Sequence, residues 1–379
     1  MNYESGVSTQ TEYPWISAMD MLAVAAENQD QRLKWSNSSR EIQELQLNMS
    51  SKDKEIQHLK KIIGKKQTLN VAIVKDKENT LKNLFKYYTG ITYKRFLALL
   101  TFLAPIECPV KYGPGRRDTK SLSEEDGLFL TICRLMHGFC LKNLATRFGL
   151  SAQSASVLFN IWLDLLYLKL GQLSIWPHRD TIINNMPSEY RKDFPTTIII
   201  IDGTEIKTQI PSALCLQSQL YSDYKSATTL KGLIGCDPNG CVMFVSELFT
   251  GSISDKSITE QSGFYDMLKT LKSIGYIKEG DAIMVDKGFN IAKEINELGL
   301  KKNIPPFTSS SRQMTASETL LTNKIAKHRV HIERLIYKVK TYILLSHCIP
   351  TSLFQKANKI WTVCCLLTLF QDVFVMDEH

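Results

Sequence analysis

Apolar and polar positions change their period along the chain, and these changes divide it into three parts. From Gln31 to about Lys66, single apolar residues recur at roughly helical spacing among Lys, Glu and Gln, which predicts an amphipathic helix. Longer apolar stripes follow, and short β-branched runs come after Pro195. We therefore expect a flexible N-terminal segment over 1–75, a helical domain over 80–172, and an α/β domain with C-terminal helices over 176–379.

The predicted N-terminal helix has two interpretations. Its apolar positions recur at a spacing typical of a short coiled coil, and they are Leu45, Leu47, Ile56, Leu59, Ile62 and Ile63. Only two or three heptads are present, and Asn48, Ser50 and Ser51 interrupt them, so a solvated amphipathic helix accounts for the segment equally well. Residues 1 to about 30 carry no sustained pattern, which predicts loose chain.

The helical domain contains a pattern typical of a helix-turn-helix. A short helix that is apolar on one face ends near Gly149, and a second helix begins at Ser151, a preferred N-cap residue. The first turn of this second helix, Ser151–Ser156, is small and polar, so it is the part that can touch DNA. Val157–Leu168 is strongly apolar and predicts core. An ordinary helical bundle fits the same pattern.

Two short apolar runs each lead directly into an aspartate. The run Ile198–Ile201 leads into Asp202, and the run 282–285 leads into Asp286. Each run predicts a buried strand, and a carboxylate at the end of a buried strand indicates that it holds a ligand. A turn or a helix cap is the alternative role for such an acid.

The surrounding pattern predicts a mixed sheet. Thr228–Cys236 and Cys241–Phe249 form a predicted hairpin, because Asp237–Gly240 between them contains strong turn formers. Helices around 258–273 and 290–298 should pack on this sheet. The resulting α/β domain places Asp202 and Asp286 on neighbouring strands.

A third acid, Glu333, lies in a basic helical segment. At 100° per residue an apolar side carries Ile325, Ile332, Ile336, Val339 and Ile343, and the opposite side carries Lys327, His331, Arg334, Lys338 and Thr341. Glu333 falls on the flank between them. Three carboxylates from two strands and a helix suit a pair of Mg²⁺ or Mn²⁺ ions, the metals of phosphodiester chemistry.

Positive charge is concentrated around Glu333. The chain has a formal net charge of +8, and the segment from Lys301 to Leu345 holds nine Lys or Arg against two acids, which is nine minus two, or +7. Such a band attracts polyanions such as DNA, although a solvated helix face is the usual alternative.

The remaining composition points to an intracellular protein. The nine cysteines show neither CxxC pairs nor a Cys and His array of zinc spacing, so we expect reduced, mostly structural thiols. No signal peptide precedes Pro14, and the apolar stretch Trp361–Phe370 is too short to span a bilayer.

Several longer motifs resemble those of DDE-superfamily transposases of the PIF/Harbinger type and of related bacterial insertion sequences, in particular the eukaryotic branch associated with THAP domains. The matching motifs are residues 176–180, 201–206, 221–225, 231–235, 251–256, 286–289 and 303–307. In the last helix Arg329, Glu333 and Lys340 fall at the family intervals, but Ala326 stands where the family has a tyrosine. No THAP-like Cys and His array is found in this sequence.

The resemblance implies an RNase H-like α/β fold, preceded by the helix-turn-helix-like domain. It implies that Asp202 bridges two divalent ions, Mg²⁺ or Mn²⁺, and that Asp286 and Glu333 each complete one. It also implies that Arg329, Lys340 and Lys287, with Lys225 as a weaker candidate, contact DNA phosphates. Three further acids lie nearby, Glu205, Asp223 and Asp255. We interpret them as acids that cap turns or make scaffold hydrogen bonds.

The function implied by the resemblance is cleavage of DNA strands and joining of their 3′-OH ends to target DNA. The implied partners are transposon-end and target DNA, a second copy of the chain in a homo-oligomer, and an accessory DNA-binding protein, with no membrane and with the nucleus as location. A host-adopted DNA-binding or chromatin protein, and a nuclease without strand transfer, remain as alternatives.

Overall fold

The computed structural model describes residues 18–66, 68–78, 80–105, 122–306 and 314–372. These residues form two compact units, one up to Gln67 and one from Thr68 onward. The basic loop expected around Lys111–Thr119 lies outside the described residues.

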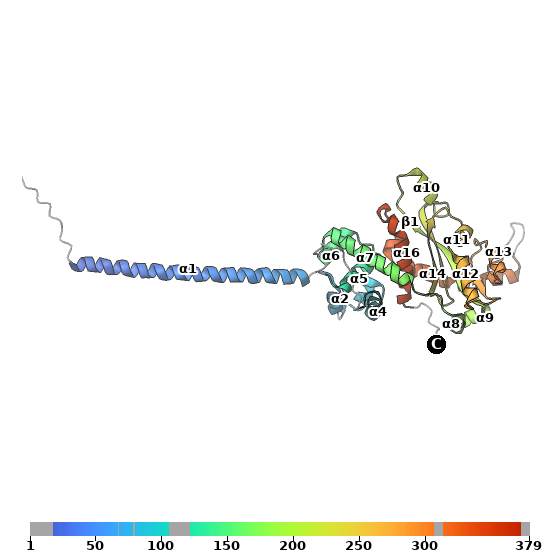
Figure 1. Cartoon of the computed structure of the whole chain (residues 1–379), viewed down its shortest axis with the longest axis horizontal. Helices are drawn as coiled ribbons and strands as arrows, with labels where there is room; N and C mark the ends of the chain where they lie inside the picture. Colours follow the sequence, from blue (N-terminus) through green and yellow to red (C-terminus); the bar gives the residue numbers. More distant parts are fainter. Residues whose placement is uncertain (1–17, 67, 79, 106–121, 307–313, 373–379) are drawn as a thin grey trace, which may run out of the picture. The chain divides into compact units, whose positions relative to one another are not determined.

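The first unit is a single helix, α1 (Ala18–Lys66), of 49 residues (Figure 1). It begins well before Gln31, so the prediction of loose chain up to about residue 30 is wrong from Ala18 onward. Sequence propensity explains the extension, because residues 18–30 contain four alanines and neither Gly nor Pro.

The described residues of the second unit start with six helices. They are α2 (Val71–Glu78), α3 (Leu84–Thr89), α4 (Tyr93–Leu103), α5 (Glu124–His137), α6 (Leu141–Phe148) and α7 (Ala152–Gly171). Val71 and Val74 of α2 are buried in this unit's core, although the predicted boundary assigned them to the N-terminal segment. Ser151 caps α7 by accepting a hydrogen bond from the Ser154 N–H. Gly149 has a φ of 67°, a left-handed conformation that lets the chain turn sharply between α6 and α7.

A six-stranded mixed sheet follows. Its strands are β1 (Thr197–Lys207), β2 (Tyr221–Ser222), β3 (Ala227–Cys236), β4 (Val242–Thr250), β5 (Ala282–Met284) and β6 (Lys301–Asn303). Among the described residues the order is β2-β3-β1-β5-β6, with β4 also paired to β3. The β3–β4 hairpin and the neighbouring β1 and β5 are as predicted, and the α/β fold class with an RNase H-like mixed sheet is confirmed.

From Ile199 onward, side chains of β1 alternate between two cores on the two faces of the sheet. Ile199 and Ile201 pack on one face with residues of α11 (Asp255–Gln261), α12 (Phe264–Ser273) and α13 (Ala292–Glu297). Ile200 packs on the other face in a core that also contains Ile332 and Trp361. That face is covered by α14 (Ala316–Lys340) and α16 (Ala357–Leu367), on the opposite side of the sheet from α11 and α12 (Figure 1).

The segment 176–195, which we expected to be a polar linker with one helix, is part of the core. It forms α8 (Arg179–Asn184) and α9 (Ser188–Asp193), and Trp176, Ile182 and Tyr190 are buried. The other described elements are α10 (Leu214–Leu220), α15 (Ile343–Ser346) and the 3₁₀ helices η2 (Thr351–Lys356) and η3 (Thr368–Phe370).

Candidate active site

Asp202 lies within a strand and not at its end. β1 continues to Lys207 because β3 pairs with it throughout, with Asp202 opposite Ile234 and Lys207 opposite Thr229. The prediction that the strand ends at Asp202 is therefore wrong. Since alternate residues of a strand share a face, the Asp202 side chain points the same way as Ile200, towards α14.

Asp286 reaches the same place from the neighbouring strand. β5 runs parallel to β1 with Met284 opposite Ile200, so Asp286, two residues after Met284, lies beside Asp202, two residues after Ile200. Arg329 of α14 bridges the two carboxylates. One terminal nitrogen, Nη2, donates to Asp202 Oδ2 at 3.2 Å, and Nη1 lies 3.2 Å from Asp286 Oδ1. The two predicted aspartates are thus brought together around one guanidinium.

The two aspartates differ in exposure. The Asp202 side chain is 20% exposed and that of Asp286 is 49% exposed. Burial raises the pKa of Asp202 to about 6, and the charges of Asp286 and Asp255 raise it too, while Arg329 and the Gly203 N–H lower it. A carboxylate with a raised pKa beside other acids is typical of a functional site.

Asp255 is a third acid of this cluster. Ser254 is the residue that caps α11, and the Asp255 carboxylate instead forms a 2.8 Å ion pair with Lys231 Nζ. A side chain at Gly203 would lie 3.0 Å from Asp255 Oδ1, and one at Gly288 would lie 3.1 Å from Oδ2. Asp255 therefore lies close to both Gly203, which follows Asp202, and Gly288, which lies two residues after Asp286.

We interpreted Asp255 as a nearby cap or scaffold acid, and its ion pair with Lys231 inside the cluster was not predicted. The signal in the sequence was the pair of glycines, one directly after Asp202 and one two residues after Asp286. Glu205 does make a scaffold hydrogen bond, accepting from Thr229 Oγ1 at 2.7 Å.

Glu333 stands apart from this cluster. It lies one turn beyond Arg329 on the same side of α14, and its side chain is exposed. Within the described ranges, no group of three or more His, Cys, Asp and Glu is arranged to hold a metal. The structure brings Asp202 and Asp286 together with Asp255 nearby, and the place of Glu333 among the ligands stays a prediction.

Of the predicted phosphate-binding lysines, Lys340 lies within electrostatic reach of Asp202, and Lys225 lies within reach of Lys340. Lys340 is partly buried at the end of α14, and burial lowers its pKa, as does the charge of Lys225, while Glu205 and Asp202 raise it. Lys225 is exposed at the tip of the β2–β3 hairpin. For Lys287 the structure gives a backbone contact, in which its N–H donates to Asp286 Oδ1 at 2.7 Å.

The predicted basic side of α14 is not wholly solvated. His331 and Lys338 are buried, contrary to the helical-wheel prediction. The reason is that α14 is covered on more than one side. The His331 ring contacts the Tyr190 ring of α9, and Lys338 donates to the backbone carbonyl of Asp372.

The start of α7 leaves part of its first turn accessible. Ser151, Ala152 and Gln153 are exposed, whereas Ser154 and Ala155 are buried. The predicted core half, from Val157 onward, includes the buried Phe159 and Trp162, although Leu168 is exposed. The exposed start of this helix is where the helix-turn-helix interpretation places DNA.

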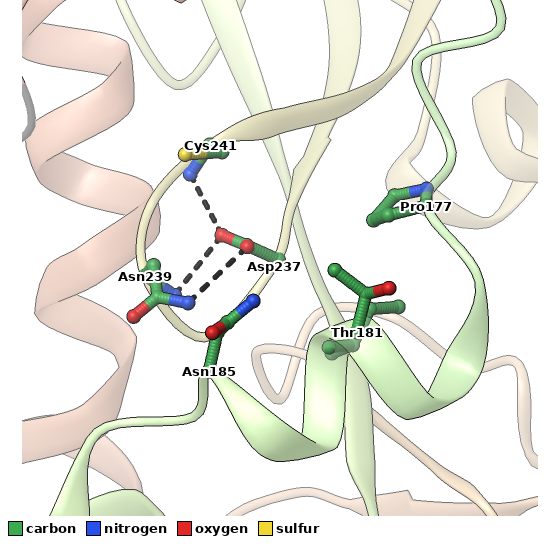
Figure 2. Close-up of a pocket in the computed structure, with 7 residues that line it drawn as sticks. Pro177, Thr181, Asn185, Asp237, Asn239 and Cys241 are labelled. Atoms are coloured by element: carbon green, nitrogen blue, oxygen red, sulfur yellow. Dashed lines mark hydrogen bonds between the residues drawn. The ribbon is translucent and has the colours of Figure 1, made fainter.

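A separate pocket of about 380 Å³ lies between α8 and the β3–β4 turn. Figure 2 shows Asp237 facing the turn backbone, with Thr181 and Asn185 on the opposite wall. The Asp237 carboxylate accepts hydrogen bonds from the N–H groups of Asn239 and Cys241 at 3.0 and 2.8 Å. The Asp237 oxygens therefore stabilise the hairpin turn, and we do not assign this pocket a carboxylate-based active site.

No helix among the described residues is both long enough and apolar enough to cross a membrane. All described cysteines are free thiols, as the composition predicted.

Two family models match the chain. Residues 201–368 match the model described as DDE superfamily endonuclease, and residues 120–172 match the helix-turn-helix of DDE superfamily endonuclease. The second match supports a helix-turn-helix over a plain helical bundle. Among solved structures, a cryo-EM structure of the piggyBac transposase synaptic complex with hairpin DNA aligns with a TM-score of 0.39 and 11% identity, covering 76% of this chain and 73% of that chain. No curated protein matches the sequence.

Proposed function

We propose that this chain, which carries a DDE superfamily endonuclease segment and its helix-turn-helix, is a metal-dependent DNA transposase of the PIF/Harbinger type. It would cut DNA phosphodiester bonds and join the freed 3′-OH ends to target DNA. The observation that carries the proposal is the convergence of Asp202 and Asp286, from parallel neighbouring strands, on one cation of α14.

The donor chemistry of the site fits a divalent metal ion. Asp202 and Asp286 offer hard carboxylate oxygens, the ligands that Mg²⁺ and Mn²⁺ prefer, and the single guanidinium that pairs with both leaves a net negative charge for a cation. Asp202 and Asp286 would hold the metal, and Glu333, one turn beyond Arg329, is the proposed additional ligand. When bound, the ions would supply Lewis-acid activation of water and stabilisation of the leaving oxygen at phosphorus.

The chain's own cations would position the DNA. Lys340 lies near Asp202 and Lys225 lies near Lys340, so the two lysines would hold phosphates on this side of the acids. Arg329, which pairs with both carboxylates, is the proposed phosphate-binding cation closest to the acids. The exposed start of α7 would contact the DNA away from the cleavage site.

A plasmid-nicking assay tests the proposal directly. The full chain is incubated with supercoiled plasmid in Mg²⁺ or Mn²⁺, beside Asp286→Asn and the control Asp266→Asn, an exposed acid on α12. We expect nicking by the native chain and the control, a loss of at least about 100-fold in Asp286→Asn, and DNA binding retained in all three. Equal nicking by Asp286→Asn would remove this site from the reaction. Labelled 3′-OH oligonucleotides then report joining, whose absence beside nicking would leave a nuclease without strand transfer.

A DNA-binding protein without cleavage is the second candidate function. It is favoured by one observation, that Arg329 satisfies both aspartates while Glu333 is directed to solvent. Salt-sensitive DNA binding by the native chain with no nicking in either metal would support it. In both cases we propose the nucleus as location, and an accessory protein as a further source of end recognition.

A further inference from the structure

We propose that α1 pairs with α1 of a second copy of this chain as a parallel, in-register, two-stranded coiled coil. The inference concerns the first compact unit and goes beyond the proposed chemistry. It depends on a seam of apolar side chains along the helix, over residues 34–59.

The apolar side chains of this part of α1 follow a heptad repeat. Counting from Trp35, every seventh residue is large and apolar, and these a positions are Trp35, Ile42, Met49 and Ile56. The d positions, three residues later, are Ser38, Leu45, Lys52 and Leu59. Of the large apolar residues exposed in this stretch, Leu47 alone falls outside the seam. A strict seven-residue period calls for a helical partner in a left-handed supercoil.

Within the described part of the first unit, the seam has no packing partner. All six of its large apolar side chains are 46% or more exposed. Contiguous exposed apolar surface of this kind marks an interaction site. A lone helix is also only marginally stable in water without packing on an apolar face. A partner that covers the seam would therefore stabilise this part of α1.

The residue types at the seam select two strands. Ile42 and Ile56 are β-branched and occupy a, whereas Leu45 and Leu59 occupy d. This arrangement favours a parallel dimer over a trimer or tetramer. A second copy is the natural occupant, because an in-register pair places each a residue against its own counterpart.

Charges beside the seam select the parallel orientation. In a parallel in-register pair, Lys52 at d faces Lys52 of the other copy, and Asp53 at e of each copy lies beside this pair and offsets the repulsion between the two lysines. An antiparallel pair that aligns the same core layers would place Glu41 against Glu55 of the other copy, and like charges would repel. Lys52 in the seam costs some stability and fixes the register, as single polar core positions do.

Solution mass measured by light scattering tests the pairing. The native full chain should have twice its 43.1 kDa mass. The double variant Ile42→Asp with Ile56→Asp should fall to a single chain. Leu47→Asp is the control, since it places an aspartate on the same helix outside the seam, and it should stay dimeric. A native monomer, a larger oligomer, or a dimer that persists in the double variant would each overturn the proposal.

Disulfide trapping tests the orientation without disturbing the helix. Ser38→Cys at a d position faces its counterpart only in a parallel, in-register pair, and Ser36→Cys at b faces solvent. Under mild oxidation we expect a covalent dimer from Ser38→Cys at least tenfold above the background shared by Ser36→Cys and the native chain. Equal amounts from the two variants would overturn the parallel arrangement. Neither experiment depends on nuclease activity, so failure here leaves the proposed function untouched.

Discussion

At the scale of single residues, the site is defined by how three acids share two cations. Asp202 and Asp286 share Arg329, and Asp255 pairs with Lys231. These pairings decide the protonation of Asp202, because burial and the neighbouring acids favour its neutral form while Arg329 favours the charged one.

The raised pKa of Asp202 predicts a pH-dependent stability in EDTA. The folded-state pKa is about 6, above the usual value of 3.8, so the folded state holds a proton that the unfolded state has lost between these values. Its contribution is complete below about pH 4 and is lost as the pH rises through about 6. Asp202→Asn removes this loss. Between pH 4 and pH 7.5, the free energy of unfolding of the variant should rise by about 2 kcal/mol relative to that of the native chain, measured by urea unfolding. A constant difference across this range would contradict the assignment.

Gly203 is predicted to matter because of the space it leaves. A Cβ there would lie 3.0 Å from Asp255 Oδ1 and 3.2 Å from Lys231 Cε, so Gly203→Ala must push this ion pair aside. We expect nicking to fall by about 10- to 100-fold with DNA binding retained, since small displacements in an active site are costly. Gly171→Ala is the control, because its Cβ meets nothing within 4 Å. Unchanged nicking in Gly203→Ala would place Asp255 outside the reaction.

At the scale of elements, the site is assembled from two strands and one helix that are far apart in the sequence. The parallel pairing of β1 and β5 aligns the aspartates, and α14 supplies Arg329 and Lys340 to the same face. The β2–β3 hairpin then adds Lys225 beside Lys340.

This arrangement predicts the salt dependence of DNA binding. Replacing Lys225 or Lys340 with Ala should remove about one phosphate contact, lowering the slope of log affinity against log salt by about one. The control is Lys269→Ala on α12, on the other face of the sheet, whose lysine pairs with Asp266. Fluorescence anisotropy with labelled duplex DNA over a salt series gives the slopes. If all three variants keep the native slope, the lysines near Asp202 do not bind phosphate.

At the scale of the whole molecule, the second unit has a core shared by its N-terminal helices and its sheet. The cluster containing Phe129 and Trp162 of the helical segment also contains Ile200 of β1 and Trp361 of α16. Trp361 is fully buried, its ring lies against Gly232 of β3, and its Nε1 donates to Ser246 O at 2.9 Å. The helices and the sheet should therefore unfold together.

Trp361→Ala tests this shared core. We expect a loss of about 3–5 kcal/mol in the free energy of unfolding, because the change leaves a large cavity and an unpaired carbonyl. The control is Tyr337→Ala, an exposed aromatic of α14, with little change expected. Urea unfolding followed by circular dichroism gives both values. Separate transitions for helices and sheet in the native chain would contradict a shared core.

The sequence by itself determined the elements with strong local signals, and these were predicted correctly. The isoleucines before Asp202, the turn at Asp237–Gly240 and the cap at Ser151 dictate strand, hairpin and helix through burial and backbone preference alone. It also singled out Asp202 and Asp286, because an acid beside a buried β-branched run is conspicuous.

Only the tertiary structure decided what those acids meet. The partner strand β3 carries β1 past Asp202, α9 buries His331, and Asp255 arrives beside Gly203 from a helix some fifty residues away. These outcomes depend on which surfaces come together, and a periodic pattern records only that a face is apolar, not what will cover it. For the same reason, the site near Asp202 could be assembled only from the tertiary structure. The heptads of α1 are local in sequence and can be counted from Trp35 without it.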